Sequence, residues 1–290
     1  MLRTKGEKSF AVVNYLFLTL FTLLCIFPVW DVVRVSLSTP ADASRAGFRL
    51  WPGQVSFTAY QNVLGNSYVW SGYRNTLARL LIGVPLNMAL SLLASYTLSR
   101  RYMPARSIFT MFIVFTMFFS GGMIPSYLVI KDLGLFDTVW ALVLPGALHT
   151  YNMLIMRNYM MSIPASLEES AMIDGANHFT ILLRIFIPLS GPIIATVALW
   201  SIVGHWNAWF DCMLYIRKPE QFVLQTILRK IVIDAAPGFG QDMGTTDVVN
   251  LSAEVVKCAT IIVSTLPILV IYPFLQKYFV KGIMVGSLKG

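Results

Sequence analysis

Long apolar runs constrain the fold of this chain more than any other feature. A helix needs roughly 20 mostly apolar residues to cross the ~30 Å hydrocarbon core of a bilayer, because it rises ~1.5 Å per residue. The runs that meet or approach this length span residues 10–30, 76–98, 108–130, 139–156, 193–210 and 259–279. The third run is interrupted by Gly121, Gly122 and Pro125. The sequence therefore predicts an all-α protein with six membrane-spanning helices.

The composition supports a bilayer as the solvent. Hydrophobic residues make up 56% of the chain and charged residues 12%, which is too little polar surface to coat a soluble globule of 290 residues. The net charge of +8 comes from basic residues interleaved with the apolar runs. This pattern is typical of residues that flank membrane-spanning helices and does not indicate a nucleic-acid-binding surface. Three separate cysteines, without CxxC or Cys/His spacing, indicate neither a disulfide framework nor a metal site.

The first run could alternatively be a cleaved signal peptide. Arg3, Lys5 and Lys8 precede it, and Ala-Asp-Ala at 41–43 resembles a cleavage site. The run is too long for a signal peptide and lies too far from that site. We therefore expect residues 10–30 to be a membrane anchor.

Basic residues in the short connections indicate the orientation. An even number of spans puts both termini on one side of the membrane. The connection at 99–107 carries three arginines, whereas the connection at 131–137 has one lysine against two acids. Most of the basic residues that this orientation assigns to the outer face lie in two long connections, near 33–74 and 214–256, where the positive-inside rule is weak. Both termini are therefore predicted to be cytoplasmic.

Motifs for catalysis or nucleotide binding are absent from the sequence. There is no G-x-x-x-x-G-K-[ST] loop and no HExxH or GxSxG pattern, and His149, His178 and His205 are isolated. The chain is thus predicted not to be an enzyme. Any ATPase that energises it would be a different polypeptide.

The connection at 162–188 is the most informative segment. Glu168 and Glu169 fall in the opening turn of a short helix, where the helix dipole favours acids. Gly175 can turn the chain, and an amphipathic segment at 179–186 leads to Pro188 at the mouth of the fifth span. The residues alone leave two readings open, a docking element or an amphipathic linker that lies on lipid.

The pattern E-x-A-x3-G-x9-I-x-[LI]-P, formed by Glu169, Ala171, Gly175, Ile185, Ile187 and Pro188, resembles the signature loop of ABC-importer permeases. Ser170 stands where alanine is usual, a small-for-small change. The resemblance implies cytoplasmic coupling helices between the fourth and fifth spans that dock in a groove of the ATPase subunit. The residues it assigns to this ATPase-coupling loop are Glu168, Glu169, Ala171, Asp174, Gly175, Ile185 and Pro188.

Further matches resemble the carbohydrate-importer subfamily, in particular the second permease subunits of maltose-type importers and their oligosaccharide and polysaccharide branch. They are Asn75-Thr76, Ala94-Ser95-Tyr96 with Ser99-Arg100, Ile124-Pro125, Leu133-Gly134-Leu135, Trp206-Asn207 and the tail from Gly286 to Gly290. In such relatives a similar tail reaches into the ATPase dimer. The resemblance thus implies a second ATPase contact at Gly286, Lys289 and Gly290, the alternative being a frayed basic terminus.

The resemblance implies an assembly and a compartment. The chain would be a single transmembrane domain over 1–290, with a core at about 70–280 and a first helix and external loop at 1–69. It would pair with a second permease subunit as a heterodimer, with two ATP-binding cassette subunits and with an extracytoplasmic solute-binding protein. The protein would be located in the bacterial cytoplasmic (inner) membrane. ATP and Mg²⁺ would bind the partner ATPase, and this chain would bind no cofactor.

Polar residues inside the spans are candidates for the route of a sugar, because polar groups facing lipid are costly. An aromatic beside an amide suits the ring faces and hydroxyl edges of a sugar. Trp206 and Asn207 are therefore the first choice, with Asn152 and His205. The alternative is hydrogen bonding between helices, worth on average ~0.6 kcal/mol per contact. The other candidates are Asn87, Thr116, Ser120, His149, Trp200 and Asp211.

Two other classes of protein compete with the importer. One is a secondary transporter or channel that uses His205 and Asp211 as intramembrane ion sites. The other is a membrane-embedded enzyme, which the lack of a catalytic cluster disfavours. The sequence leaves the cargo open between neutral and acidic sugars, and basic residues in the external connections point only faintly to anions. These residues are Arg45, Arg49, Arg217 and Lys218.

Overall fold

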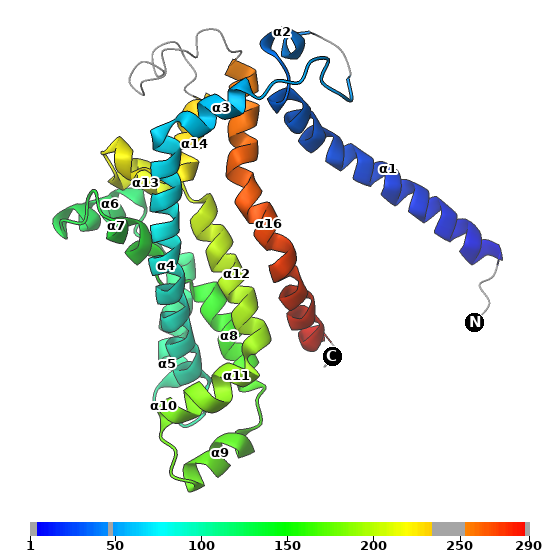
Figure 1. Ribbon diagram of the computed structural model, residues 1–290. Helices are drawn as coiled ribbons and strands as arrows, with labels where there is room; N and C mark the ends of the chain where they lie inside the picture. The colour runs from blue at the N-terminus through cyan, green and yellow to red at the C-terminus, as the bar shows by residue number, and fades with distance from the viewer. Residues whose placement is uncertain (1–4, 46–48, 234–252, 288–290) are drawn as a thin grey trace. The chain divides into compact units, whose positions relative to one another are not determined.

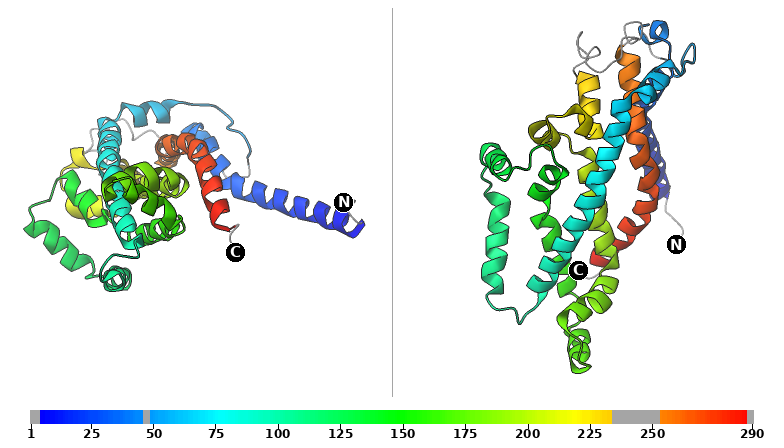
Figure 2. Two further views of the ribbon diagram at one scale, coloured as in Figure 1. Left: turned by 90° about the horizontal axis from the view of Figure 1, so that it is seen from below. Right: turned by 60° about the vertical axis from the view of Figure 1, so that its left-hand side comes forward.

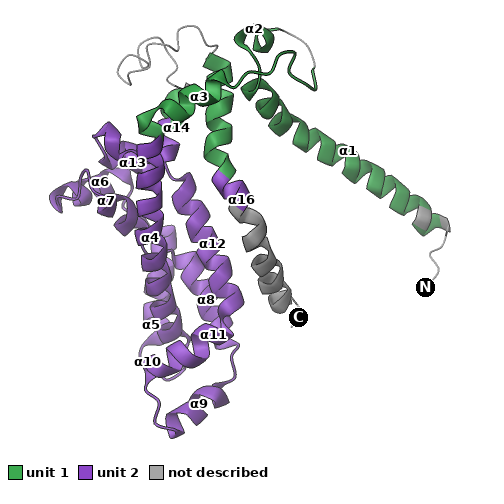
Figure 3. Cartoon of the chain, in the orientation of Figure 1, with its two compact units in different colours: residues 1–69, 228–266 green, residues 70–227, 267–290 purple. Residues whose placement is uncertain are grey.

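The computed structural model describes residues 5–45, 49–233 and 253–287, and these are almost entirely helical (Figure 1). In the described part of the chain, β-structure is limited to one isolated antiparallel bridge between Ser38 and Val55. The chain divides into two compact units, residues 1–69 with 228–266 and residues 70–227 with 267–290 (Figure 3). The prediction of a helical protein is confirmed in this coarse form.

The first unit contains α1 (Lys5–Ser36), α2 (Pro40–Ala43), α3 (Thr58–Gly65), the end of α14 (Leu224–Ile233) and the start of α16 (Ala253–Ser287). Residues 9–36 of α1 are long and apolar enough to cross a bilayer, and none of their most apolar window is buried within the protein. An apolar helix exposed on every side is suited to lipid. The anchor predicted at 10–30 is thus part of a longer helix.

The loop after α1 folds back on that helix. The indole N–H of Trp30 donates to the Leu50 carbonyl at 2.7 Å, and the Trp30 and Trp51 rings meet edge to face. The Asp42 carboxylate accepts from the Gly53 N–H and from the Arg49 guanidinium. The Gly53 N–H and the Arg49 charge hold the pKa of Asp42 below its usual value, although burial opposes them.

The second unit is built around α4 (Ser67–Ser99). It also contains α5 (Arg106–Phe118), α6 (Met123–Asp132), α7 (Val139–Val143), η1 (Leu144–Gly146), α8 (Thr150–Met161), α9 (Ala165–Ile173), α10 (His178–Ile181), the π-helix η2 (Leu182–Phe186), α11 (Ile187–Leu189), α12 (Gly191–Asn207), α13 (Phe210–Tyr215) and η3 (Pro219–Gln221). Figures 1 and 2 show α4, α8 and α12 running alongside one another. This bundle positions the sites described below.

Two of the predicted spans, 108–130 and 139–156, are broken, and a third bend comes just before the predicted span 193–210. The pairs α5 with α6, α7–η1 with α8, and α10–α11 with α12 bend by 109°, 50° and 84°. The first break lies where the sequence places Gly121 and Gly122, and Gly122 takes a φ of +85°, which glycine adopts without strain. Among the described residues, three helices have the length and composition to cross a membrane, or up to six if each bent pair is one span.

Candidate functional site

The predicted break in the segment 162–188 is a glycine turn at the end of α9. Gly175 has a φ of +81°. Its N–H donates to the Met172 carbonyl at 3.0 Å, and the Ala176 N–H donates to the Ala171 carbonyl at 2.9 Å. This pair of bonds closes a helix whose next residue is left-handed. A Cβ on Gly175 would meet nothing within 4 Å, so backbone conformation and not crowding favours glycine here.

The second arm of the segment begins at Asn177, whose side-chain oxygen accepts from the Thr180 N–H at 2.8 Å and caps α10. The helix continues through η2 into α11, which holds Pro188 in its first turn. One face of this arm is buried and the other exposed, as the amphipathic pattern predicts. Its buried residues are Ile181, Leu182 and Phe186, and its exposed residues include Phe179 and Leu183.

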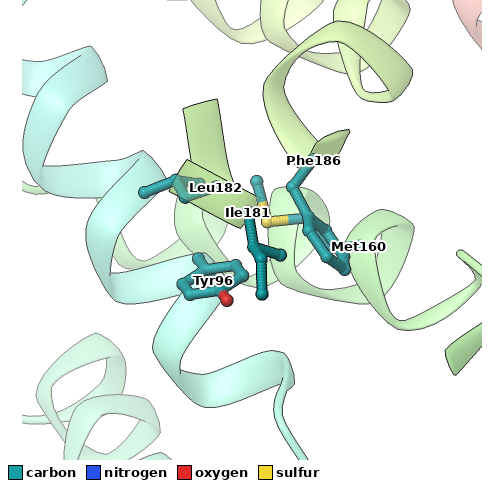
Figure 4. Close-up of a cluster of buried hydrophobic side chains, with 5 residues drawn as sticks. All are labelled: Tyr96, Met160, Ile181, Leu182 and Phe186. Carbon is teal, nitrogen blue, oxygen red and sulfur yellow. The ribbon is translucent and has the colours of Figure 1, made fainter. Parts of the chain in front are cut away.

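The buried face joins a small apolar cluster at one end of the bundle (Figure 4). Its members come from α4, α8, α10 and η2, and they are Tyr96, Met160, Ile181, Leu182 and Phe186. The Tyr96 and Phe186 rings meet edge to face with centroids 5.2 Å apart. Ala171 and Ile185, two residues of the predicted coupling loop, pack against the cluster. One side of the segment therefore packs against the bundle, and the other side is exposed.

Helix α9, the predicted coupling helix, presents most of its surface outward. Leu167 and Ile173 are exposed, Ile173 to 86%, and the Glu169 and Asp174 side chains lie among the exposed residues. Glu168 alone in this helix is buried, at 6% exposure. A surface that combines exposed apolar side chains with acids suits a protein partner better than water alone.

Glu168 is held by residues that follow α4. Its carboxylate forms an ion pair with Arg100 and accepts from the Tyr102 hydroxyl at 2.6 Å. The Tyr102 ring stacks on His178, the first residue of α10, at 5.7 Å between centroids. Burial and the Glu168 carboxylate raise the pKa of Tyr102 above its usual value, so the phenol remains a hydrogen-bond donor.

A second charged centre lies inside the bundle. Arg79 on α4 is 4% exposed and forms a two-bond ion pair with Asp211 on α13. Its guanidinium also donates to His205 Nδ1 at 3.2 Å and to the Leu142 carbonyl at 3.1 Å. A buried guanidinium needs such partners, because an unpaired charge in an apolar environment is very costly. Arg79 thus joins α4 to α7, α12 and α13.

Gly83 lets α12 come close to α4 beside this centre. A Cβ at Gly83 would lie 2.7 Å from His205 Nε2, closer than real Cβ contacts. Other buried polar residues along the same helix make hydrogen bonds to its neighbours. Asn87 donates to the Ala147 carbonyl at 3.2 Å, and Ser95 donates to the Met153 carbonyl at 2.8 Å. These contacts are the helix-to-helix bonds expected for polar groups in a bundle.

Residues 80–285 match the family described as "Binding-protein-dependent transport system inner membrane component". The chain belongs to this family. The match covers the whole segment 162–188 and most of the bundle, so this permease is a membrane component of binding-protein-dependent transport.

Two curated relatives from Bacillus subtilis (strain 168) match over nearly their full lengths. The polygalacturonan/rhamnogalacturonan transport system permease protein YtcP is 40% identical to this permease over 98% of the present chain and 99% of its own. The maltodextrin transport system permease protein MdxG is 28% identical over 96% of both chains. A solved bacterial ABC transporter involved in the import of the acidic polysaccharide alginate contains a chain with a TM-score of 0.89. That chain is 34% identical, and the match covers 96% of this permease and 99% of the solved chain.

The structure places the predicted coupling residues of the permease in two environments. Glu168 is buried, Ala171 and Ile185 are partly buried, and Glu169, Asp174, Gly175 and Pro188 are exposed. Gly286 lies in the last turn of α16, and Lys289 and Gly290 lie outside the described residues. Their assignment to an ATPase contact stays a prediction.

The predicted sugar-path residues of the permease are not all brought together. Trp206 is 4% exposed and packs near Tyr73 at 6.4 Å between ring centroids, whereas Asn207 is exposed. Asn152 is 8% exposed on α8, and His205 bonds to Arg79. Their roles in transport stay predictions.

Sequence reasoning missed Arg79 and the pairing of Arg100 with Glu168. A charged residue inside an apolar run was a usable signal for Arg79, because intramembrane charges almost always have a function or a partner. No spacing rule connects Arg100 to Glu168, which are 68 positions apart. That contact becomes visible only after α9 folds back on the end of α4.

Proposed function

We propose that this chain is the six-span permease subunit of an ATP-driven importer of oligosaccharides. The observation that carries the proposal is α9, a short helix with an exposed apolar and acidic face that is anchored to the bundle by one buried residue, Glu168. The ATPase activity belongs to two ATP-binding cassette subunits, one of which docks on this face. A second permease subunit and an extracytoplasmic solute-binding protein complete the assembly.

The orientation follows from the same segment. If the ATPase subunits are cytoplasmic, α9 and the three arginines of residues 99–107 lie on the cytoplasmic side. Six spans then return both termini to that side of the bacterial inner membrane. In this topology α5 with α6 and α7–η1 with α8 count as one span each, α12 is the fifth span, and α10–α11 stay on the cytoplasmic side.

Coupling needs an element that both the ATPase and the cargo pathway influence. Closure of the ATPase dimer moves α9, and the bundle follows between inward-open and outward-open arrangements. The chain supplies no nucleotide site for this cycle, and its contribution is the movement of its helices.

An oligosaccharide that contains uronic acids is the first cargo to test. Two relatives support this choice: YtcP is named for polygalacturonan and rhamnogalacturonan, and the solved transporter imports an acidic polysaccharide. Exposed Arg217 and Lys218, at the end of α13, add positive charge in the connection that this topology places outside. A neutral maltodextrin, the cargo named for MdxG, is the comparison cargo.

The competing secondary transporter would need a free titratable group in the bundle. Asp211 is instead paired with Arg79, and His205 bonds to the same guanidinium. A neutralised carboxylate is a poor carrier for a transported proton or ion. The geometry therefore favours the ATP-driven importer.

The proposal can be tested in proteoliposomes that contain this permease with its partner permease, ATPase subunits and binding protein. We expect uptake of tetragalacturonate that requires ATP, and weaker or no uptake of maltotetraose. Uptake that proceeds without the ATPase subunits and follows an ion gradient would refute the proposal. A preference for maltotetraose would support the importer function and contradict the proposal of an acidic cargo.

Gly175→Val tests the coupling loop in the same system. A branched residue in a left-handed turn is strained by about 1–2 kcal/mol, so the end of α9 should shift while the bundle remains folded. We expect uptake per ATP hydrolysed to fall by about tenfold or more. Gly175→Asn, which tolerates this backbone region, should retain most of the uptake. Normal coupling in Gly175→Val would contradict the role of the turn.

A further inference from the structure

The attachment of α9 to the rest of its unit is unusual for a surface helix. Such helices normally bury an apolar stripe. The buried residue of α9 is instead a carboxylate, Glu168, while Leu167 and Ile173 face outward. A force applied to the exposed face of α9 is therefore resisted by the bonds that Glu168 makes and by the packing of Ala171 against the apolar cluster.

Arg100 is the main partner of that carboxylate, and the protein encloses its guanidinium on every side. Besides the Glu168 carboxylate, it donates to Ser99 Oγ at 3.0 and 2.8 Å and to the Met160 carbonyl at 3.4 Å. Its central carbon lies 4.1 Å from the centroid of the Phe186 ring and 5.1 Å from that of Tyr96. The guanidinium is planar and donates several hydrogen bonds while it lies against two aromatic rings, an arrangement that the compact ammonium of lysine does not reproduce.

These contacts join four elements at one point. Arg100 and Ser99 lie at the end of α4, Met160 is on α8, Phe186 is on η2, and Glu168 is on α9. Tyr102 adds a contact to the start of α10, because its hydroxyl lies 3.3 Å from His178 Nδ1 as well as bonding Glu168. Both arms of the coupling loop are thus held by residues 99–102.

We propose that Arg100 and Glu168 are positioning residues for transport, which tie α9 to the end of α4 so that both move together. The inference rests on the proposed function, since it specifies how a push on α9 reaches the bundle. Helix α4 also carries Arg79, the centre of the second charged cluster. The Arg100–Glu168 ion pair therefore connects the ATPase-facing surface with the helix that contacts α12 and α13.

The first test measures amide hydrogen exchange in the purified assembly without cargo. Arg100→Gln and Glu168→Gln are compared with Arg101→Gln, which removes the neighbouring exposed charge. In the first two variants, exchange in residues 165–176 should be faster by about tenfold or more, with α12 unchanged. Arg101→Gln should match the unmodified protein. Unchanged exchange of α9 in both test variants would overturn the proposal.

The second test measures uptake of tetragalacturonate per ATP hydrolysed, together with co-purification of the ATPase subunits. Arg100→Gln should lower this ratio by about fivefold or more while basal hydrolysis and subunit binding remain normal. Arg100→Lys should be intermediate, because charge remains but the planar contacts are lost. The exchanged pair Arg100→Glu with Glu168→Arg should recover part of the ratio.

Loss of ATPase binding in parallel with uptake would overturn the proposal, because Arg100 would then only shape the docking surface. If the unmodified assembly imports no oligosaccharide, the proposed function fails. The hydrogen-exchange experiment still decides whether the Arg100–Glu168 ion pair holds α9. If Arg100→Gln does not accumulate in the membrane, Glu168→Gln, which retains an acceptor oxygen, is judged by the same two measurements.

Discussion

Two arginine–carboxylate pairs, one within α4 and one at the residue that follows it, differ in how they are enclosed. At the end of α4, the side chains of Arg100 and Glu168 are exposed to 8% and 7%. Within α4, Arg79 is exposed to 4%, but its partner Asp211 to 28%. The first pair is closed to water on both sides, whereas the second is open on the carboxylate side. The same chemistry thus serves as a rigid attachment in one place and as an accessible centre in the other.

The difference also concerns what each arginine would meet if its partner were lost. Arg100 lies at the end of the apolar helix, and it would keep Ser99, the Met160 carbonyl and two aromatic rings. Arg79 lies within an apolar span and would keep only His205 and the Leu142 carbonyl among its described partners. The penalty for an unpaired charge should therefore be larger at Arg79.

Asp211→Ala should have the largest effect on stability. It leaves a buried guanidinium without its counter-ion, at a cost of about 3–5 kcal/mol. The measurement is the thermal unfolding midpoint of the purified permease in detergent. Replacing both partners, Asp211→Ala with Arg79→Leu, should recover most of the loss. An unchanged midpoint for the single variant would show that the pair is not energetically important.

Glu168→Ala should destabilise the protein less, by about 2–3 kcal/mol, because Arg100 retains several acceptors and aromatic contacts. The thermal unfolding midpoint of this variant is compared with that of Asp211→Ala. The comparison would be reversed if Glu168→Ala proved the more destabilising of the two. Such a result would mean that the end of α4, and not its centre, limits the stability of the bundle.

Gly83→Ala tests how closely α12 must approach the open pair. The added Cβ would lie 2.7 Å from His205 Nε2, and overpacking should cost about 1–2 kcal/mol. Gly204→Ala on α12 is the matched control, since a Cβ there meets nothing within 4 Å. The control should be neutral or slightly stabilising in the same unfolding experiment. Equal behaviour of the two variants would argue against a tight approach at Gly83.

The smallest effect is expected at Asp42, a third paired carboxylate that lies outside the spans. Its pKa is lowered by the Gly53 N–H and by Arg49. The charged form therefore stabilises the loop above the ordinary carboxyl pKa, and this contribution disappears as the pH falls through the lowered value. Hydrogen exchange of residues 49–56, corrected for intrinsic rates, should show this loss below about pH 4. Asp42→Asn should show no such pH-dependent step.

Much of the structure of the segment 162–188 could be predicted from local sequence. Gly175 marks a turn because only a residue without a Cβ adopts that conformation freely, and the spacing of Ile181, Leu182 and Phe186 indicates one buried face. The polar centre was predicted only in part. His205 and Asp211 were recognisable as intramembrane polar groups, but the arginine that binds both is 126 and 132 positions away from them in the chain.

Local sequence is enough to establish that the chain is helical, apolar enough for a bilayer and interrupted at particular glycines, because these properties depend on neighbouring residues and on the length of each run. The tertiary structure alone decided which charges are neutralised. An ion pair forms between residues that folding brings within a few ångströms, and Arg79 with Asp211 or Arg100 with Glu168 meet only when separate helices pack. Local composition contains no information on that distance.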